Sequence, residues 1–228
     1  MIRSQHIYSV KWKTIYKVGC LPFYPIYLNM KKTTFLVLTA LSVGTIIQGC
    51  GDSQKDSKET ADSTNEAKID SSLVDSVATA TTTPAGEADS KFAVDAAEGG
   101  MAEVELGQLA EQKAMSADVK AFGSMMVKDH SKANEELKAL AQRKGITLPT
   151  ALGEANQKHK DDLSAKSGSD FDKAYIDLMV EDHKKDVKLF EDAHQKVADP
   201  DIKAFIVKTL PTLKAHLSHI EGIEKAKK

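Results

Sequence analysis

The chain is poor in cysteine and tryptophan. Its 228 residues include two cysteines, Cys20 and Cys50, and one tryptophan, Trp12. Because no cysteine follows position 50, a disulfide or a cysteine nucleophile is excluded for the rest of the chain. Neither a Gly-x-Ser-x-Gly motif nor a glycine-rich phosphate loop occurs. We therefore predict no catalytic residues, and a protein stabilised by its core or by a ligand.

The chain also has no large excess of positive or negative charge. The formal net charge is −2 at pH 7. Lysine and arginine dominate the first 34 residues, acidic residues dominate 51–90, and the remainder is nearly neutral. Proteins that bind nucleic acid present a strongly basic face. We therefore exclude nucleic acid as a partner.

The main apolar run is too short to cross a membrane. It extends over Phe35–Ile47, which is 13 residues, whereas a spanning helix needs roughly 20. Lys31 and Lys32 precede the run and Cys50 follows it, which is the order found in a secretory signal peptide. We predict a signal peptide over 30–49 that is removed. Residues 1–29 are then either an untranslated extension or a long basic leader.

The end of this signal, Ile47-Gln48-Gly49-Cys50, resembles the lipobox of bacterial lipoproteins. The resemblance implies that Cys50 becomes the lipidated first residue and that the membrane is a partner through this lipid. A single acyl chain binds a membrane only marginally, so stable anchoring needs more than one. We expect a protein of the cell envelope, anchored in the outer membrane or facing the periplasm. An ordinary cleavage site and a soluble exported protein are the alternative.

Composition divides the remainder into a tether and a domain. Residues 50–90 are rich in Ser, Thr, Asp and Ala with few aliphatic side chains, so we predict a disordered acidic tether. Over 91–228 apolar residues recur at helical spacing and no strand-like alternation is present. The sequence therefore predicts one all-α domain.

Four long helices and one short helix are expected in this domain. The long ones cover about 91–113, from a cap at Ser116 to Lys144, from a cap at Ser169 or Asp170 to about Val197, and from Pro200 onward. The short helix covers about 154–165, within the longest connection. Long amphipathic helices in this number predict a four-helix bundle.

One motif occurs twice in the domain. KAFGSMMVKDH, ending at His130, returns 53 residues later as KAYIDLMVEDH, ending at His183. Apolar residues at helical spacing surround both copies, so each Asp-His pair is expected on or beside a buried helix face. The same periodicity places Glu103 and His216 on the buried faces of the first and last long helices. One polar residue from each helix would then face the core.

Buried imidazoles and carboxylates are costly unless they are paired or bind an ion. A metal site, mononuclear or dinuclear, is one interpretation, with iron, zinc, manganese or copper bound by Glu103, Asp129, His130, Asp182, His183 and His216. A purely structural hydrogen-bond network is the other. Met126 and Met179 precede the two histidines by four residues, so they either add thioether ligands for copper(I) or simply fill the core. Adjacent Asp and His do not match the Glu-x-x-His pattern of di-iron bundles, so an oxygen-activating centre is not expected.

Four segments resemble the bacterial domain of unknown function 4142 family, whose members are often labelled outer-membrane proteins. They are FAVDAAEGGMAEVELGQLA, VKAFGSMMVKDH, FDKAYIDLMVEDH and LPTLKAHL, within about residues 91–225. The resemblance implies an exported protein with an antiparallel ferritin-like bundle, directs attention to the same six polar residues, and implies no activity.

These observations predict a lipid-anchored envelope protein whose bundle binds a metal ion. The alternative is an interaction or stress-related module with a structural polar core. A redox enzyme is a third reading, and the sequence identifies no protein partner.

Overall fold

The computed structural model describes residues 56–74 and 85–227, which all belong to the compact unit Gly51–Lys228. They form six helices and no strand, which confirms the all-α class for this part of the chain. The helices are α1 (Ser57–Val74), α2 (Glu87–Lys113), α3 (Ala117–Lys144), α4 (Glu154–Ser164), α5 (Gly168–Lys196) and α6 (Pro200–Ala226). None of these helices is long and apolar enough to cross a membrane. The predicted leader, signal peptide and Cys50 lie outside the described residues.

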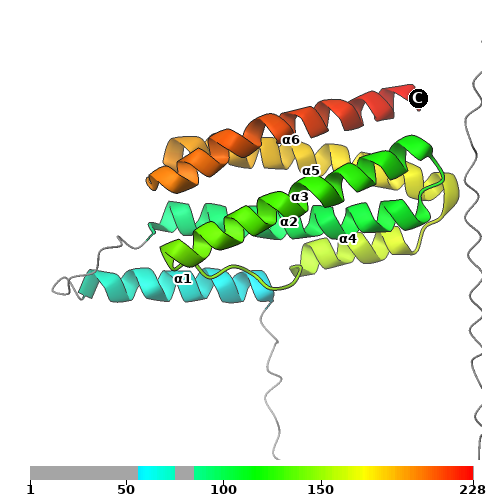
Figure 1. Ribbon diagram of the computed structural model, residues 1–228. Coiled ribbons are helices and arrows are strands. Elements are labelled where there is room, and N and C mark those ends of the chain that lie inside the picture. The colour runs from blue at the N-terminus through cyan, green and yellow to red at the C-terminus, as the bar shows by residue number, and fades with distance from the viewer. Residues whose placement is uncertain (1–55, 75–84, 228) are drawn as a thin grey trace, which may run out of the picture. The chain divides into compact units, whose positions relative to one another are not determined.

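The four long helices α2, α3, α5 and α6 lie side by side (Figure 1). α2 packs against α3 and α5, and α6 packs against the same two helices. Each of these neighbouring pairs runs in opposite directions (Figure 1). α3 and α5 run in the same direction, because the connection between them crosses the length of the domain and contains α4.

Local signals in the sequence explain several helix ends. α3 begins after Ser116 and stops at Gly145, as predicted. The Ser116 side chain makes no capping hydrogen bond; the Asp172 carboxylate instead accepts from the N–H groups of Met115 and Ser116. Gly145 has a φ of 69°, the left-handed conformation that glycine adopts at no steric cost. At the start of α6 the Asp199 carboxylate accepts hydrogen bonds from the backbone N–H groups of Asp201 and Ile202.

Two helix starts differ from the prediction. α5 begins at Gly168 after the cap position Ser167, and α2 begins at Glu87, four residues before Lys91. At α2 the reason is tertiary. The buried Asp89 carboxylate accepts hydrogen bonds from the N–H groups of Gly86, Ala198 and Asp199, which joins this first turn to the α5–α6 connection.

Helix α1 corrects the prediction of a disordered tether over residues 50–90 for the segment Ser57–Val74. α1 packs against α2, and polar contacts also join it to the chain that follows α3. The Asn65 side chain donates to the carbonyl of Thr147 (2.9 Å) and accepts from its N–H (2.8 Å). The Ser57 hydroxyl accepts a hydrogen bond from the N–H of Thr150. Ala61 is the only buried apolar residue described in α1, so hydrogen bonds to specific partners dock this helix where its composition could not.

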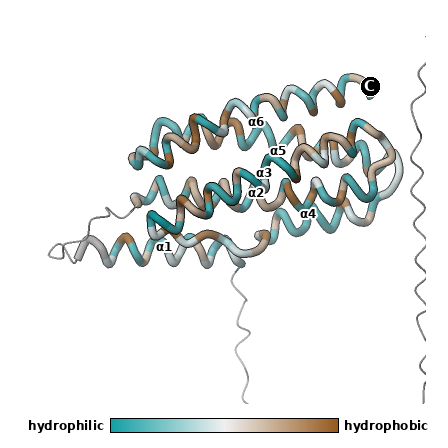
Figure 2. Tube along the Cα trace, viewed as in Figure 1, coloured by the Kyte–Doolittle hydropathy of each residue, from teal (hydrophilic) through white to brown (hydrophobic). Residues whose placement is uncertain are grey.

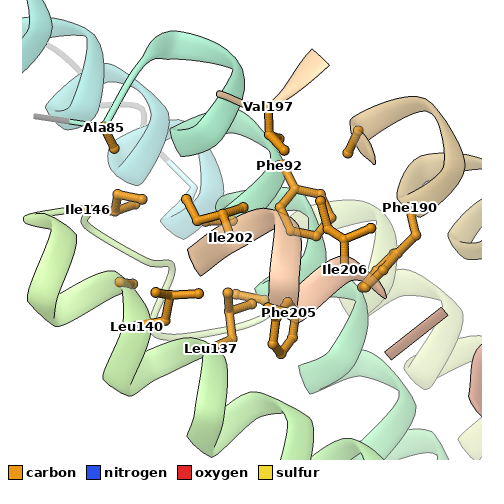
Figure 3. Close-up of a cluster of buried hydrophobic side chains, with 14 of the residues drawn as sticks. Ala85, Phe92, Leu137, Leu140, Ile146, Phe190, Val197, Ile202, Phe205 and Ile206 are labelled. Carbon is orange, nitrogen blue, oxygen red and sulfur yellow. The ribbon is translucent and has the colours of Figure 1, made fainter. Parts of the chain in front are cut away.

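Apolar and polar residues alternate along every helix, as expected for amphipathic helices (Figure 2). The buried apolar residues form two clusters. The first is shown in Figure 3 and includes Phe92 and Phe190, whose rings meet edge to face with centroids 5.0 Å apart. The second cluster includes Leu106, Phe122, Met126, Tyr175, Met179 and Ile220.

The backbones of α2 and α3 approach closely at a pair of glycines. A Cβ atom on Gly107 would lie 2.8 Å from the carbonyl oxygen of Gly123, and a Cβ on Gly123 would lie 2.8 Å from that of Gly107. These distances are shorter than van der Waals contact, so a larger residue at either position would separate the two helices.

Gly107→Ala is therefore expected to lower the free energy of unfolding by about 1–3 kcal/mol, the usual cost of overpacking a core. Gly222→Ala in α6 is the matched control, because a Cβ there meets nothing within 4 Å. The control should stabilise the protein by about 0.5–1 kcal/mol, since alanine favours helix more than glycine does. Urea unfolding measures both values. Equal stabilisation by the two substitutions would contradict the close helix contact.

Candidate metal centre

Each long helix contributes one polar side chain to a buried layer. Glu103 comes from α2, His130 from α3, His183 from α5 and His216 from α6, and these residues are between 0 and 5 % exposed. Along α3, α5 and α6 the histidine separates residues of one apolar cluster from residues of the other. The four side chains therefore form a polar layer between the two clusters, in the core positions that the helical periodicity predicts.

One nitrogen of each imidazole faces an oxygen acceptor. His130 Nδ1 lies 2.7 Å from Glu103 Oε2, and His183 Nδ1 lies 2.9 Å from the carbonyl oxygen of Met179. His216 Nε2 lies 3.0 Å from Asp129 Oδ2. The carbonyl of Met179 can only accept, so His183 carries its proton on Nδ1 and a lone pair on Nε2. The Asp129 carboxylate assigns His216 in the same way, and Glu103 does so for His130 when it is ionised.

The second nitrogen of each ring has no hydrogen-bond partner. His130 Nε2, His183 Nε2 and His216 Nδ1 are all buried and unpaired. One nitrogen from each of the three rings lies within 4.8 Å of the others. Glu103 Oε1 approaches His183 Nε2 at 3.3 Å without forming a hydrogen bond, and it too is buried and unpaired. Unpaired polar atoms in a core are rare and costly, and here one belongs to each ring of the three-histidine cluster.

Burial keeps the three imidazoles neutral. Loss of hydration lowers the pKa of His130 to about 4 and that of His183 to about 3, from an ordinary value of 6.5. Burial also lowers the pKa of His216, although its hydrogen bond to Asp129 opposes this change. All three rings therefore present a lone pair at neutral pH, which is the form that binds metals.

Two carboxyl groups meet beside the histidines. Burial raises the pKa of Glu103 to about 8 and places that of Asp186 well above its usual range. The two groups are within hydrogen-bonding reach, and their mutual repulsion adds to the shift at Asp186. The sequence analysis did not select Asp186. Its position three residues after His183, and hence on the same helix face, is the signal that would have identified it.

The two aspartates of the repeated motif lie in different surroundings. Asp129 contacts His216 on α6 rather than its own neighbour His130, and its side chain is 31 % exposed. Asp182 lies 3.8 Å from Lys185, and burial raises its pKa. The structure therefore brings together three of the six predicted ligands, His130, His183 and His216. It places Asp129 behind His216 as an acceptor, whereas Glu103 lies against both His130 Nδ1 and the unpaired His183 Nε2.

The remaining features of the motif lie in the core. Met126 and Met179 are fully buried, each one helical turn before a histidine of the layer. Phe122 packs against the layer from the second apolar cluster, with its ring centroid 5.9 Å from that of His183. The repeated segment thus supplies both the histidines and the apolar side chains next to them.

The chain belongs to the family described as "Domain of unknown function (DUF4142)", which it matches over residues 74–223. This match confirms the resemblance found in the sequence, and it leaves nearly all of α1 outside the matched region. A comparison with curated proteins gave no match.

Solved structures of similar fold include a DUF305 fragment from Deinococcus radiodurans, with a TM-score of 0.55 at 13 % identity over 62 % of this chain and 97 % of that one. CopM in the Cu(II)-bound form has a TM-score of 0.53 at 16 % identity, over 61 % and 97 %. CopM in the Cu(I)-bound form has a TM-score of 0.52 at 16 % identity, over 60 % and 96 %. At these identities the likeness shows the fold alone.

The lowered pKa of His183 predicts a specific response to acid. Between pH 6.5 and about 3 the unfolded chain binds a proton at this residue and the folded protein does not, so folding loses stability as the pH falls. His183→Leu lacks this titration. The stability of wild type relative to His183→Leu should therefore fall below pH 6.5, by at most about 1.4 kcal/mol per pH unit.

Urea unfolding at pH 7 and pH 5, with a chelator present, measures this difference. The titrations of Glu103 and Asp186 are present in both proteins and largely cancel. His194→Leu, which changes a histidine outside the buried layer, is the control. Parallel pH profiles for wild type and His183→Leu would contradict the lowered pKa.

Proposed function

We propose that this DUF4142 family member binds one transition-metal ion through His130, His183 and His216. The observation that carries the proposal is the geometry of the three rings. Each has one nitrogen beside an oxygen acceptor and the other nitrogen buried and unpaired, and the three rings offer nitrogens within 4.8 Å of one another. Histidine ligands of metals typically have this arrangement, in which an outer acceptor sets the tautomer and makes the ring a better donor.

A purely structural polar network accounts less well for these atoms. Such a network would pair the polar groups with one another, yet three ring nitrogens and Glu103 Oε1 have no partner. Each unpaired buried group costs about 1–3 kcal/mol. An ion bound to the three nitrogens would remove that cost for all three rings at once.

Copper is the ion that we favour. Imidazole suits copper, zinc, iron and nickel, and thioethers favour copper(I). Met126 and Met179 place sulfur atoms on the helix faces that carry His130 and His183. The similar fold of CopM, known in Cu(I)-, Cu(II)- and Ag-bound forms, supports the same choice.

The carboxyl groups next to the histidines would balance the positive charge of the ion. The Glu103 carboxylate would accept the Nδ1 proton of His130, and Asp129 would do the same for His216 Nε2. Asp186, whose pKa is raised by burial and by Glu103, would stay protonated and donate a hydrogen bond to Glu103. Ion binding is therefore expected to favour an ionised Glu103 and to release protons near neutral pH.

The cellular setting is a further part of the proposal. The lipobox-like sequence at Cys50 supports a lipid anchor, in the outer membrane or facing the periplasm. The single long crossover between α3 and α5 supports assignment of the domain to the antiparallel ferritin-like bundles. A copper site on such a protein would serve storage, sensing or protection against metal stress in the envelope, without catalysis.

Metal analysis of the tag-free compact unit, residues 51–228, tests the proposal. Loading with Cu(I) or Ag(I) should give about one ion per chain. The single variants His130→Ala, His183→Ala and His216→Ala should each bind at least about tenfold more weakly, because a metal ligand is lost. His194→Ala should bind as the parent does.

Thermal unfolding provides a second readout. Saturating ion should raise the unfolding free energy of the parent by about 2.7 kcal/mol at one hundred times its dissociation constant, and should not do so in the triple alanine variant. A parent that takes up no copper, silver, zinc, iron or manganese would contradict the proposal and favour an interaction module with a structural polar core.

A further inference from the structure

A solvent-open cavity of about 170 Å³ lies between α3 and α6 and reaches the buried histidines. Its wall includes His130 and His216, and Asp129, Thr209 and Thr212 line it nearer the surface. Four other cavities on the described surface contain none of the three histidines. The α3–α6 cavity is therefore an opening that leads from solvent to the polar layer.

The two ends of the layer are closed by packed apolar side chains. His183 has no exposed surface, and Phe122 and Met179 in the second apolar cluster are equally buried. The first cluster covers the opposite end through Leu137 and Leu213, which are at most 3 % exposed. An ion crossing the first cluster would lose all its hydration without gaining a ligand, which is prohibitively costly. In the second cluster it would meet only the fully buried thioethers of Met126 and Met179.

Asp129 occupies the boundary between the cavity and the layer. Its side chain is 31 % exposed, while its Oδ2 is bonded to the nearly inaccessible His216 Nε2. A hydrated cation in the cavity would meet this carboxylate first and the free nitrogens of His130 and His216 next. The cation would exchange its water ligands first for the Asp129 carboxylate and then for imidazole nitrogens. It would therefore never be without both water and protein ligands.

The rim of the cavity is held by an ion pair between the two helices. Lys208 Nζ on α6 lies 2.6 Å from Glu136 Oε2 and 2.9 Å from Glu136 Oε1 on α3. Lys132, which is exposed, adds a second cation to the lining. These two lysines offset the negative charge of Asp129 and Glu136 in the same lining, and so weaken the attraction of the cavity for an incoming cation.

We propose that the α3–α6 cavity is the route by which the ion enters and leaves the three-histidine site, with Asp129 as the residue that passes it from solvent to the imidazoles. This inference rests on the proposed function. It adds the path, the side of the domain from which the ion is delivered, and residues that control the rate of exchange without being ligands.

The test compares the rates of ion binding and release with the dissociation constant, because a residue of the path and a metal ligand affect them differently. A substitution that narrows the path slows binding and release by the same factor and leaves the dissociation constant unchanged. A lost ligand weakens binding instead. Thr212→Phe at the exposed edge of the cavity should slow both rates about tenfold, equivalent to about 1.4 kcal/mol of added barrier. Ser218→Phe, on α6 but outside the cavity, is the matched control and should change neither rate.

Cu(I) is the probe. Release is followed by transfer to a chromogenic chelator, at concentrations where the rate no longer depends on the chelator, and binding is followed by stopped flow. Thr209→Phe, deeper in the cavity, provides a second blocking variant in case the first perturbs folding. Circular dichroism and thermal unfolding of the apo proteins establish that each variant is folded.

A charge variant tests the rim independently. Lys132→Gln combined with Lys208→Gln should speed Cu(I) binding at low ionic strength, and the gain should shrink as salt is added. Lys173→Gln, at the start of α5 and outside this cavity, should leave the rate unchanged.

The outcomes separate the two claims. Stoichiometric Cu(I) binding with unchanged rates in both blocking variants would overturn the access route and leave the three-histidine site intact. A change in affinity without a matching change in both rates would also overturn the route. A parent that binds no Cu(I) would overturn the proposed function, and the inference with it.

Discussion

Three imidazoles in an apolar core impose the constraint on which the rest of this structure depends. Each ring brings two polar nitrogens, and burial removes the water that would otherwise satisfy them. The protein supplies three acceptors, from Glu103, Asp129 and the carbonyl of Met179. Two of these contacts join different helices, α2 to α3 and α3 to α6, so satisfying the rings also fixes how the helices meet. The remaining nitrogens stay buried without a partner, in three rings that lie next to one another.

The apolar clusters on either side give this polar layer its chemical character. They exclude water, which lowers the pKa of the histidines, raises that of Glu103, and keeps the rings as neutral donors over a wide pH range. They also hold the rings in place, because close contacts such as the one between Gly107 and Gly123 leave the helices little freedom to shift. A site built in this way is organised before its ligand arrives. Organisation of that kind reduces the entropic cost of binding.

Much of the fold could be predicted from hydrophobic periodicity and helix-end signals. The limits of α3, the short helix α4 and the long helix that begins at Pro200 all follow from the order of apolar, capping and breaking residues. The failure at α1 has a physical cause. In its docking, the Asn65 side chain donates to one backbone carbonyl and the Ser57 hydroxyl accepts from a backbone N–H, both more than 80 residues away, and composition carries no information about such partners. The start of α2 was misplaced for a similar reason, since Asp89 bonds across to the α5–α6 connection.

The candidate site also divides into features that the sequence predicts and features that depend on tertiary contacts. The repeat and the helical period determined that His130, His183, His216 and Glu103 face the core, because a helix places residues three and four apart on one face. Only the tertiary structure decided which of the polar residues meet. Asp129 reaches across to His216, Asp186 joins Glu103, and Asp182 turns toward Lys185. Periodicity specifies the face on which a side chain lies. The distances between atoms on different helices depend on packing angles and helix offsets, which are set by the whole core and not by any one segment.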